Sequence, residues 1–530
     1  MQNKEKYQDL LSNWACKKIN GNKTIDEFLT FDKDIHYWTF HRFRFFSLSY
    51  NIPFRDSDTR YQPIINKKKE SFLIQLRTKV IYFGISIYLN FTILYFLFIS
   101  LFANKNKKRN GTEKKRIGIL THESEIKINS KEKITDIYRT KKIYDELIKE
   151  KKKPLIIVGT QLLKPWKKPK NKGDYIKVLD YSTLNIFKNS ISESIKIHKK
   201  WKNLNIKNKQ NAFQIEGQSI FTYVKDDLNF LFSFPIIFAN IYYYYLFKEI
   251  IKTENLGSIL TISGIRERCA LAACYKQNIP GIYLAHATQW HGKYYEFFPN
   301  TNYFVFSESD KQKILEGSKI NNNKIKAVGP YLIDDVINKY KNKKSKEKDI
   351  LIFSQHKYVD YGEKKYSEFL KKAFESLKGF KNIKIKMHPR DKKEYLYSDA
   401  LEFNGIKDYE IIKSIQSNKN QNILYDSILN ASITISFGSA AILDALALKK
   451  PTLVIKFNKK DSIFPEAKSL TYVNYSDNYS KILKKMIEDK TFRKNIKKNI
   501  DEDIKYYYHK LDGKSAERIA KNIIKLNGEK

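Results

Sequence analysis

The sequence predicts an α/β protein with two Rossmann-like domains, preceded by a helical extension that associates with a membrane. Short β-rich runs alternate with helical stretches, and this alternation stops at a charged linker and then restarts. Strands that alternate with helices indicate a parallel sheet with helices on both faces, so the restart indicates a second sheet. A long uncharged segment before the first domain carries the membrane prediction.

Composition narrows the class of protein. The chain has 530 residues and a formal net charge of +42, carried mostly by lysines spread along its whole length. It contains no zinc finger, RNA-binding aromatic motif or basic-region heptad, so we expect no nucleic-acid partner. A diffuse lysine surface is expected, with attraction to anionic lipid as the alternative. The three cysteines fit neither a zinc site nor a disulfide framework, which favours a reducing compartment. No cleavable signal peptide is recognised at the start of the sequence.

Two N-terminal segments precede the predicted domains. Residues 1–78 are expected to form short helices, in which "HYWTFHRFRFF" (36–46) suits a membrane interface or a small satellite core. Residues 79–104 form a hydrophobic segment whose uncharged part, 80–103, is long enough to cross a bilayer as a helix. A spanning helix, a re-entrant anchor, and a buried or interfacial helix remain alternatives. Basic residues flank it on both sides, so its orientation is open, and we expect the cytoplasmic face of the inner membrane.

The first predicted Rossmann-like domain spans residues 115–337. Its expected strands are 116–121, 154–159, 176–180, 258–263, 281–286, 302–307 and 325–329, with helices near 135–152 and 266–277. The apolar run 230–247 contains proline, asparagine and many tyrosines, and it predicts a core or membrane-facing helix rather than a span.

The second predicted domain spans residues 348–530. Its expected strands are 349–354, 383–386, 422–425, 432–436 and 452–456, with helices near 364–378 and 439–449 and a long charged helical tail. Ligands of open α/β sheets bind beyond the carboxyl ends of the strands. With two such domains, we expect the ligand in the cleft between them.

Two strand ends in the second domain carry candidate binding residues. The run "IKIKMHPRD" (383–391) alternates like a half-buried strand and then ends at His388 and Pro389. Pro389 holds the histidine backbone extended, which fixes where the imidazole points. An ordinary strand end followed by polar loop residues is the alternative.

The run "ITISFGSAAILDALALKK" (433–450) predicts a buried strand, a tight turn and a helix. Ser436 ends the strand, Gly438 lies in the turn, and Ser439 takes the N-cap position. A helix that follows a strand directly offers N–H groups and the positive end of its dipole to an anion. We therefore predict a phosphate site, with an ordinary capped turn as the alternative.

Together, "KMHPRD" and "SFGSAAILDALALKKP" resemble the donor-binding domain of GT-B transferases that make bacterial surface polysaccharide. These include polysialyltransferases, capsule Kdo transferases and CDP-glycerol glycerophosphotransferases. The run "IPGIYLAHATQWHGKYYEFFPNTNYFVFSESDKQKIL" is similar to the end of the first domain in capsule-synthesis relatives. The resemblance covers roughly residues 255–460, and it implies a GT-B fold and metal-independent transfer from a nucleotide-activated donor.

The resemblance implies nucleotide-binding roles for His388, Arg390, Ser436, Gly438 and Ser439. His388 matches the His-Pro histidine and would contact a donor phosphate, while Arg390 would add a bidentate contact. Ser439 matches the serine motif, but the second serine of the paired form is Ala440 here. The acidic-acidic-Gly motif of polysialyltransferases is not evident, which argues against sialyl transfer.

The predicted catalytic residues lie in the first domain. His291, in "HATQWHG", matches the His-Gly turn and is a candidate base, and His286 is a second candidate in the same run. Glu123, in "LTHESE", follows the first strand, where an acceptor-side carboxylate is expected. Gln355 and His356 follow the first strand of the second domain and are expected to line the cleft. For each residue, a satisfied loop side chain is the alternative.

No metal site and no cofactor are predicted, because the sequence has no dinucleotide glycine fingerprint or Walker-type loop and its acidic clusters lie outside the strand-rich region. The predicted function is that of a membrane-associated glycosyltransferase or polyol-phosphate transferase. It would move a unit from a nucleotide-activated sugar or polyol donor to a glycan or lipid-linked acceptor of a bacterial surface polysaccharide. The alternatives are a nucleotide-sugar 2-epimerase on the same fold and a non-catalytic polysaccharide-assembly scaffold.

Overall fold

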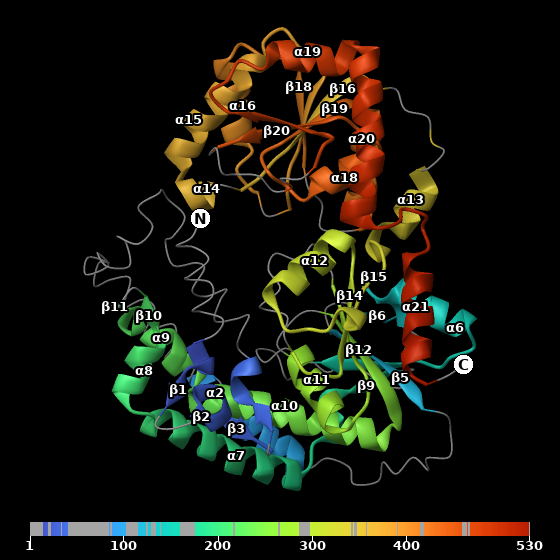
Figure 1. Ribbon diagram of the computed structural model, residues 1–530. Coiled ribbons are helices and arrows are strands. Elements are labelled where there is room, and N and C mark those ends of the chain that lie inside the picture. The colour runs from blue at the N-terminus through green and yellow to red at the C-terminus, as the bar shows by residue number, and fades with distance from the viewer. Residues whose placement is uncertain are drawn as a thin grey trace. The chain divides into compact units, whose positions relative to one another are not determined.

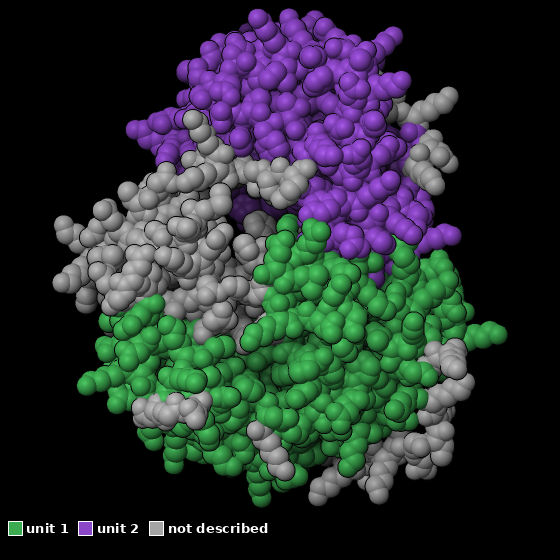
Figure 2. Space-filling model, in the orientation of Figure 1, with its two compact units in different colours: residues 1–305, 310–327, 516–530 green, residues 306–309, 328–515 purple. Residues whose placement is uncertain are grey.

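The structure is a computed structural model that describes most of the chain. The described residues are 14–19, 23–32, 34–40, 84, 87–88, 90–101, 115–122, 126–128, 134–137, 139–159, 175–215, 218–262, 266–285, 297–340, 343, 347–356, 358–389, 391–413, 418–457, 464 and 467–528. The chain divides into two compact units, which are coloured separately in Figure 2. Unit 1 comprises residues 1–305, 310–327 and 516–530, and unit 2 comprises residues 306–309 and 328–515.

Unit 1 contains a seven-stranded, wholly parallel sheet in the order β15-β14-β13-β12-β5-β8-β9. Its strands are β5 (Arg116–His122), β8 (Leu155–Gly159), β9 (Tyr175–Lys177), β12 (Leu256–Ile262), β13 (Gly281–Leu284), β14 (Thr301–Val305) and β15 (Ile325–Ala327). The central strand β12 is buried along its whole length, as expected for a parallel strand covered on both faces. The predicted α/β class is confirmed.

The helices of unit 1 include one that is apolar almost all round. They are α6 (Lys141–Lys149), α7 (Leu184–Asn203), α8 (Ile206–Ala212), α9 (Phe221–Leu231), α10 (Phe234–Thr253), α11 (Arg266–Lys276) and α21 (Ser515–Leu526), and α12 (Glu308–Gly317) begins at the boundary between the units. α10 packs against both α7 and α11, and 14 of its 20 residues are buried. Burial on all sides explains the apolar run that the sequence placed at 230–247.

The C-terminal helix belongs to unit 1, although the sequence predicted residues 348–530 as one domain. Asn522 accepts a hydrogen bond from Lys326 Nζ in β15 (2.7 Å), and Asn527 donates to the Lys115 carbonyl (3.1 Å). The amphipathic helix α21 therefore returns to the first sheet, which a charged helical pattern alone could not reveal.

The described parts of the N-terminal extension are not purely helical. They comprise two small hairpins, one short α-helix and two 3-10 turns: β1 (Lys18–Ile19), β2 (Lys23–Thr24), β3 (Thr30–Phe31), β4 (Ile35–His36), α2 (Ile25–Phe28), η1 (Trp14–Cys16) and η2 (Tyr37–Phe40). The Trp14 ring lies 4.7 Å from that of Trp38 and 6.1 Å from that of Trp201 in α7. These aromatic side chains are buried in the core of unit 1, so the first half of "HYWTFHRFRFF" is core.

The hydrophobic segment contributes a helix, Asn90–Leu101, that rests on unit 1. Phe96 stacks on Tyr242 of α10 at 4.8 Å, and Ser100 Oγ lies 2.6 Å from Ser182 Oγ. Among the described residues, no single helix combines the length and apolar character needed to cross a bilayer; one bent pair, Val224–Leu231 with Phe234–Thr253, does so by length and composition.

Unit 2 contains a six-stranded, wholly parallel sheet in the order β18-β17-β16-β19-β20-β21, which is seen at the top of Figure 1. Its strands are β16 (Asp349–Phe353), β17 (Ile383–Lys386), β18 (Tyr409–Ile412), β19 (Ala431–Ser436), β20 (Thr452–Lys456) and β21 (Leu470–Asn474). Its helices are α13 (Asp334–Tyr340), α14 (Tyr358–Tyr361), α15 (Glu363–Phe374), α16 (Tyr395–Phe403), α17 (Asn418–Asn430), α18 (Ala441–Ala447), α19 (Ser480–Glu488) and α20 (Lys490–Tyr508).

Several sequence-predicted elements are wrong. Residues 422–425 were expected as a strand but lie in α17, because Tyr425, Ile428 and Leu429 form one buried helical stripe. A helix was expected to begin near residue 135, but β7 (Ile134–Ile137) lies there and pairs antiparallel with β6 (Ile126–Ile128). The edge strands β18 and β21 and the short β10 (Gln214–Ile215) and β11 (Gln218–Ser219) were not predicted, since partly exposed or very short strands carry little apolar signal.

Candidate functional site

Three neighbouring strands of unit 2 end beside one another. β16 lies between β17 and β19, and all three are parallel, so their carboxyl ends meet at one edge of the sheet. Gln355 and His356 follow β16, His388 follows β17, and Gly438 and Ser439 follow β19. The sequence prediction that the His-Pro strand and the serine turn belong to one sheet is therefore confirmed.

The backbone of His388 is held by the loop after β16. Its N–H donates to Ser354 Oγ at 2.8 Å, and Ser354 N–H donates to the Lys386 carbonyl at 3.0 Å. The His388 ring lies 5.1 Å from the His356 ring, measured between centroids, with the planes tilted by 32°. Two partly buried imidazoles thus lie side by side at the strand ends.

Gln355 connects this pair to the turn after β19. Its Nε2 donates to the Gly438 carbonyl at 3.2 Å. Its Oε1 and the Nδ1 of His356 are buried, and neither has a hydrogen-bond partner in the part of the chain that the structure describes. Buried polar atoms are nearly always satisfied, so two unsatisfied atoms on adjacent residues mark this edge as a place for a polar ligand.

Two buried tyrosines hold the backbone of Gln355. The Tyr397 hydroxyl accepts from Gln355 N–H at 2.9 Å and lies 2.8 Å from Asp391 Oδ2, to which it donates. The Tyr366 hydroxyl donates to the Gln355 carbonyl at 2.9 Å. Burial raises the pKa of both tyrosines well above its usual value, so both hydroxyls stay protonated donors. The sequence analysis missed this network, because nothing in the spacing of the two tyrosines marks them as neighbours of Gln355.

The turn after β19 is closed by its own serines. Gly438 has a φ of 100°, a conformation that favours glycine. Ser436 Oγ accepts from the N–H groups of Gly438 (3.2 Å) and Ser439 (3.0 Å), and Ser439 Oγ accepts from Ala441 N–H (3.3 Å). The helix that follows, α18, has seven residues. The prediction of Ser439 as the N-cap is wrong by one residue, because Ala440 takes that position in α18 and no side chain caps the helix. The serine hydroxyls instead close the turn, and a phosphate role for Ser436, Gly438 and Ser439 stays a prediction.

Four of the predicted site residues, Glu123, His286, His291 and Arg390, lie outside the described residues. His122, which precedes Glu123, ends β5 and is partly buried. Burial and the nearby guanidinium groups of Arg266 and Arg139 lower the pKa of His122. Among the described residues, no group of three or more His, Cys, Asp or Glu side chains could hold a metal ion.

Comparisons with known proteins give only distant matches. No protein-family model and no curated protein sequence matches the chain. A UDP-GlcNAc 2-epimerase from Neisseria meningitidis, solved with UDP-GlcNAc, is 13% identical over 77% of this chain and 100% of that one, with a TM-score of 0.46. The wall teichoic acid polymerase TagF is 15% identical over 86% of this chain and 98% of that one, with a TM-score of 0.42. Identities and scores at this level assign no family and transfer no activity.

Proposed function

We propose that the chain is a transferase that uses a nucleotide-activated donor, and that the donor binds at Gln355, His356 and His388 in unit 2. The observation that carries the proposal is a pair of imidazole rings with centroids 5.1 Å apart, beside a buried amide oxygen of Gln355 that has no hydrogen-bond partner among the described residues. A nucleotide diphosphate has the complementary groups. Its phosphate oxygens accept from imidazole N–H, while its hydroxyl or base N–H groups can donate to the Gln355 amide.

In this proposal His388 acts on the leaving nucleotide. Negative charge builds on the phosphate as its bond to the transferred unit breaks, and a fixed imidazole N–H stabilises that charge without reorganisation. The Ser354 hydroxyl and Pro389 hold the His388 backbone, which supplies the fixed geometry. The attacking group is a hydroxyl of a glycan or lipid-linked acceptor, and His291 and Glu123 remain the proposed bases. No metal or cofactor takes part in the proposed step.

The test is nucleotide binding followed by product analysis. CMP, CDP, UDP and GDP are added to the full chain and the unfolding temperature is measured, because a ligand at 100 times its dissociation constant stabilises by about 2.7 kcal/mol. One nucleotide should raise the unfolding temperature of the wild type and of His36→Ala, an imidazole variant in unit 1, but not that of His388→Ala. If none of the four acts, the proposed donor site is wrong.

Product analysis separates the alternatives. A transferase releases nucleotide from its donor only when an acceptor is present. A nucleotide-sugar 2-epimerase equilibrates its sugar nucleotides without an acceptor, and a scaffold does neither. Nucleotide release that requires an acceptor supports the transferase proposal. Conversion of one sugar nucleotide into another without an acceptor would refute it and support the epimerase alternative.

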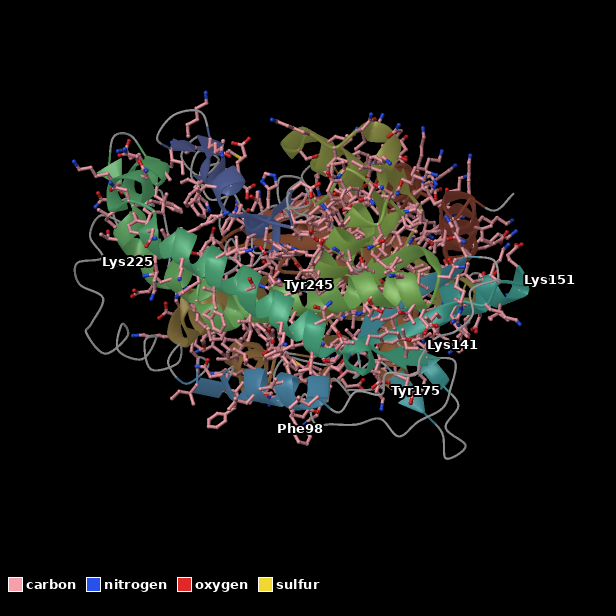
Figure 3. All side chains as sticks on the ribbon, turned by 90° about the horizontal axis from the view of Figure 1, so that it is seen from below. Phe98, Lys141, Lys151, Tyr175, Lys225 and Tyr245 are labelled. Carbon is pink, nitrogen blue, oxygen red and sulfur yellow. The ribbon has the colours of Figure 1, made fainter. Side chains whose placement is uncertain are left out.

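We also propose that unit 1 binds the surface of a membrane through the helix Asn90–Leu101. Phe91, Leu94, Phe98 and Leu101 are 67%, 61%, 59% and 54% exposed, respectively. Their spacing puts them on one face of the helix, opposite Phe96, which is 1% exposed. Figure 3 shows Phe98 pointing outward from this helix.

An anionic lipid surface suits this segment for two reasons: the exposed face of the helix is apolar, and the residues that flank the segment in the sequence are basic. Lysines and arginines flank the segment in the sequence on both sides, at 77, 79, 105, 107, 108 and 109. Anionic headgroups attract such residues by about 1 kcal/mol each. A helix held on the protein by one face, with the other face apolar and basic flanks, is typical of interfacial attachment.

Vesicle binding tests the membrane proposal. The double variant Phe91→Ser with Phe98→Ser should bind phosphatidylglycerol vesicles at least tenfold more weakly than the wild type, since burial of each ring contributes about 2 kcal/mol. Phe403→Ser is the matched control, because Phe403 is 69% exposed but lies in unit 2. Equal vesicle binding by all three proteins would refute this attachment site.

A further inference from the structure

Two arginines of α11 have opposite surroundings. Arg268 is 6% exposed, and its Nη1 donates to the carbonyls of Thr39 (3.1 Å) and Phe40 (3.2 Å). Arg268 therefore ties the N-terminal extension to unit 1. Arg266, two residues earlier, makes no hydrogen bond or ion pair within the described parts of the chain, although its Nη1 is buried.

The Arg266 guanidinium is nevertheless held in place. Its Cζ lies 4.6 Å from the centre of the Tyr243 ring of α10. It also lies against the end of β8, where a Cβ on Gly159 would be 3.4 Å from Nη1. A guanidinium stacked on a ring keeps its in-plane N–H groups available, so Arg266 is an oriented donor whose Nη1 lacks an acceptor.

Arg266 lies close to the imidazole of His122 at the same end of the sheet. His122 ends β5, the strand between β8 and β12, and α11 follows β12 along the chain. Burial, Arg266 and Arg139 lower the pKa of His122, so a second guanidinium acts on the same imidazole. An oxyanion bound beside Arg266 would offset the repulsion between these guanidinium groups and a protonated imidazole.

We propose that Arg266, with His122 and Arg139, forms a binding site for a phosphate or carboxylate group at the carboxyl end of the unit 1 sheet. An oxyanion there accepts a charge-assisted hydrogen bond from Arg266 Nη1 and satisfies that buried atom. Binding breaks no covalent bond and needs no co-reactant. The site lies in unit 1 and the proposed donor site in unit 2, so either can fail without the other.

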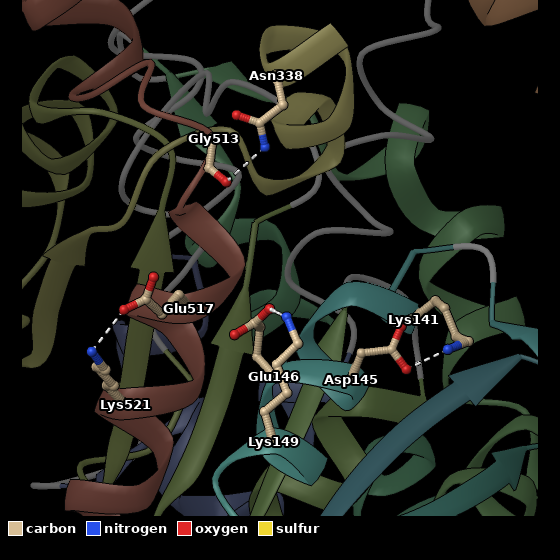
Figure 4. Close-up of polar contacts among 8 residues, drawn as sticks. All are labelled: Lys141, Asp145, Glu146, Lys149, Asn338, Gly513, Glu517 and Lys521. Carbon is tan, nitrogen blue, oxygen red and sulfur yellow. Dashed lines mark hydrogen bonds and ion pairs between the residues drawn. The ribbon is translucent and has the colours of Figure 1, made fainter.

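In the experiment, inorganic phosphate is titrated into the full chain, and the signal of the His122 imidazole is followed by nuclear magnetic resonance. The wild type, Arg266→Gln, Arg266→Lys and Lys149→Gln are titrated at constant pH and ionic strength, and His122→Asn assigns the signal. Lys149 is the matched control because it is an exposed cation of unit 1, paired only with its helix neighbour Glu146 at 2.6 Å (Figure 4). Circular dichroism establishes that each variant is folded.

Phosphate should shift the His122 signal of the wild type and of Lys149→Gln at the same concentration. Arg266→Gln should need at least tenfold more phosphate, as the loss of one charge-assisted hydrogen bond predicts. Arg266→Lys should fall between them, because it keeps the charge but loses the planar donor. A parallel titration with acetate distinguishes the two oxyanions: an equal shift identifies a carboxylate site as well. If neither anion moves the His122 signal, or if Arg266→Gln responds like the wild type, the proposal is overturned.

Discussion

The carboxyl ends of the two parallel sheets hold their polar side chains by different means. In unit 2, neutral hydroxyls set the positions: Ser354 holds His388, and Tyr366 and Tyr397 hold Gln355. In unit 1, Arg266 is placed by stacking on Tyr243 and by the space beside Gly159.

The two sheet edges therefore differ in whether hydrogen bonds or a positive charge is their main feature. Hydroxyl groups fix the backbones of Gln355 and His388 through hydrogen bonds to backbone groups, and the Asp391 carboxylate accepts from one of these hydroxyls, so the two backbones are positioned without a ligand. The Arg266 guanidinium is oriented by its contact with Tyr243, and its charge is the feature that the proposed anion would bind. We therefore expect substitutions in unit 2 to change geometry and stability, and substitutions at Arg266 to change anion binding.

The largest expected effect is on turnover in unit 2. His388→Ala removes the imidazole that is proposed to stabilise the leaving nucleotide, so turnover should fall by about a hundredfold or more, or about 3 kcal/mol. The variant should stay folded, since His388 is only partly buried. Steady-state rates with saturating donor and acceptor give the comparison, with His36→Ala as the control. If turnover is unchanged in His388→Ala, the proposed role is wrong and His388 is an ordinary histidine at the end of a strand.

The next effect breaks the hydroxyl network. Tyr397→Phe removes the partner of Gln355 N–H and of Asp391, both in the interior of unit 2, so unfolding should be easier by about 2–3 kcal/mol. Urea unfolding monitored by circular dichroism measures the loss, because all five tryptophans of the chain lie in unit 1. Tyr366→Phe is the matched variant, and it should cost less because Tyr366 donates to a carbonyl that Tyr397 also contacts. A loss below about 0.5 kcal/mol in Tyr397→Phe would show that the network does not hold the loop.

The sequence was sufficient for the fold class and for the sheet edge that carries the candidate donor site. Continuous apolar runs such as β12 and β19 predict buried parallel strands, and parallel strands of one sheet must end at one edge. The sequence was insufficient where a short apolar run fits both the strand period of 2 and the helix period of 3.6, as at residues 422–425. Three or four residues do not distinguish a strand from one helical turn.

The site itself was only partly predictable. His388, Gln355 and Ser439 were recognised because they follow strands, where the topology alone gives a position. Tyr397 and Asp391 were not, since their roles arise from a helix that packs behind the loop, and no local pattern records that contact. The same is true of Arg266, whose position depends on a contact with Tyr243 in another helix.

A third prediction contrasts one carboxylate from each unit. In unit 2, burial raises the pKa of Asp444 to about 6, although Tyr425 donates to it at 2.7 Å. The unfolded side chain ionises near pH 4, so the folded state is disfavoured progressively as the pH rises from about 4 to 6 and by a constant amount above that. Asp444→Asn should therefore gain about 3 kcal/mol relative to the wild type across this window.

Asp32 in unit 1 should behave in the opposite way. Burial would raise the pKa of Asp32, but hydrogen bonds from Lys248 (2.7 Å) and Tyr244 outweigh it, and the pKa is lowered. Its stabilisation is present above the unfolded pKa and is lost as the pH falls through the folded value. Asp32→Asn should thus lose stability relative to the wild type as the pH rises, whereas Asp444→Asn gains it. Unfolding curves between pH 3 and pH 8 measure the stability difference between each variant and the wild type. If both differences change with pH in the same direction, the predicted contrast between Asp444 and Asp32 is wrong.

The smallest expected effect decides what the serines of the turn do. Ser436 is fully buried, and its hydroxyl accepts from two backbone N–H groups, so Ser436→Ala should cost about 1 kcal/mol of stability, as the loss of a helix cap does. Ser439→Ala is the companion variant and should cost less, because Ser439 Oγ accepts a single bond of 3.3 Å. If the hydroxyl of Ser436 only closes the turn, nucleotide affinity in Ser436→Ala should stay within about twofold of the wild type, since no phosphate contact is lost. A fall of tenfold or more in nucleotide affinity, measured by calorimetry on the folded variant, would instead make Ser436 a phosphate ligand and extend the donor site from the imidazole pair to the turn after β19.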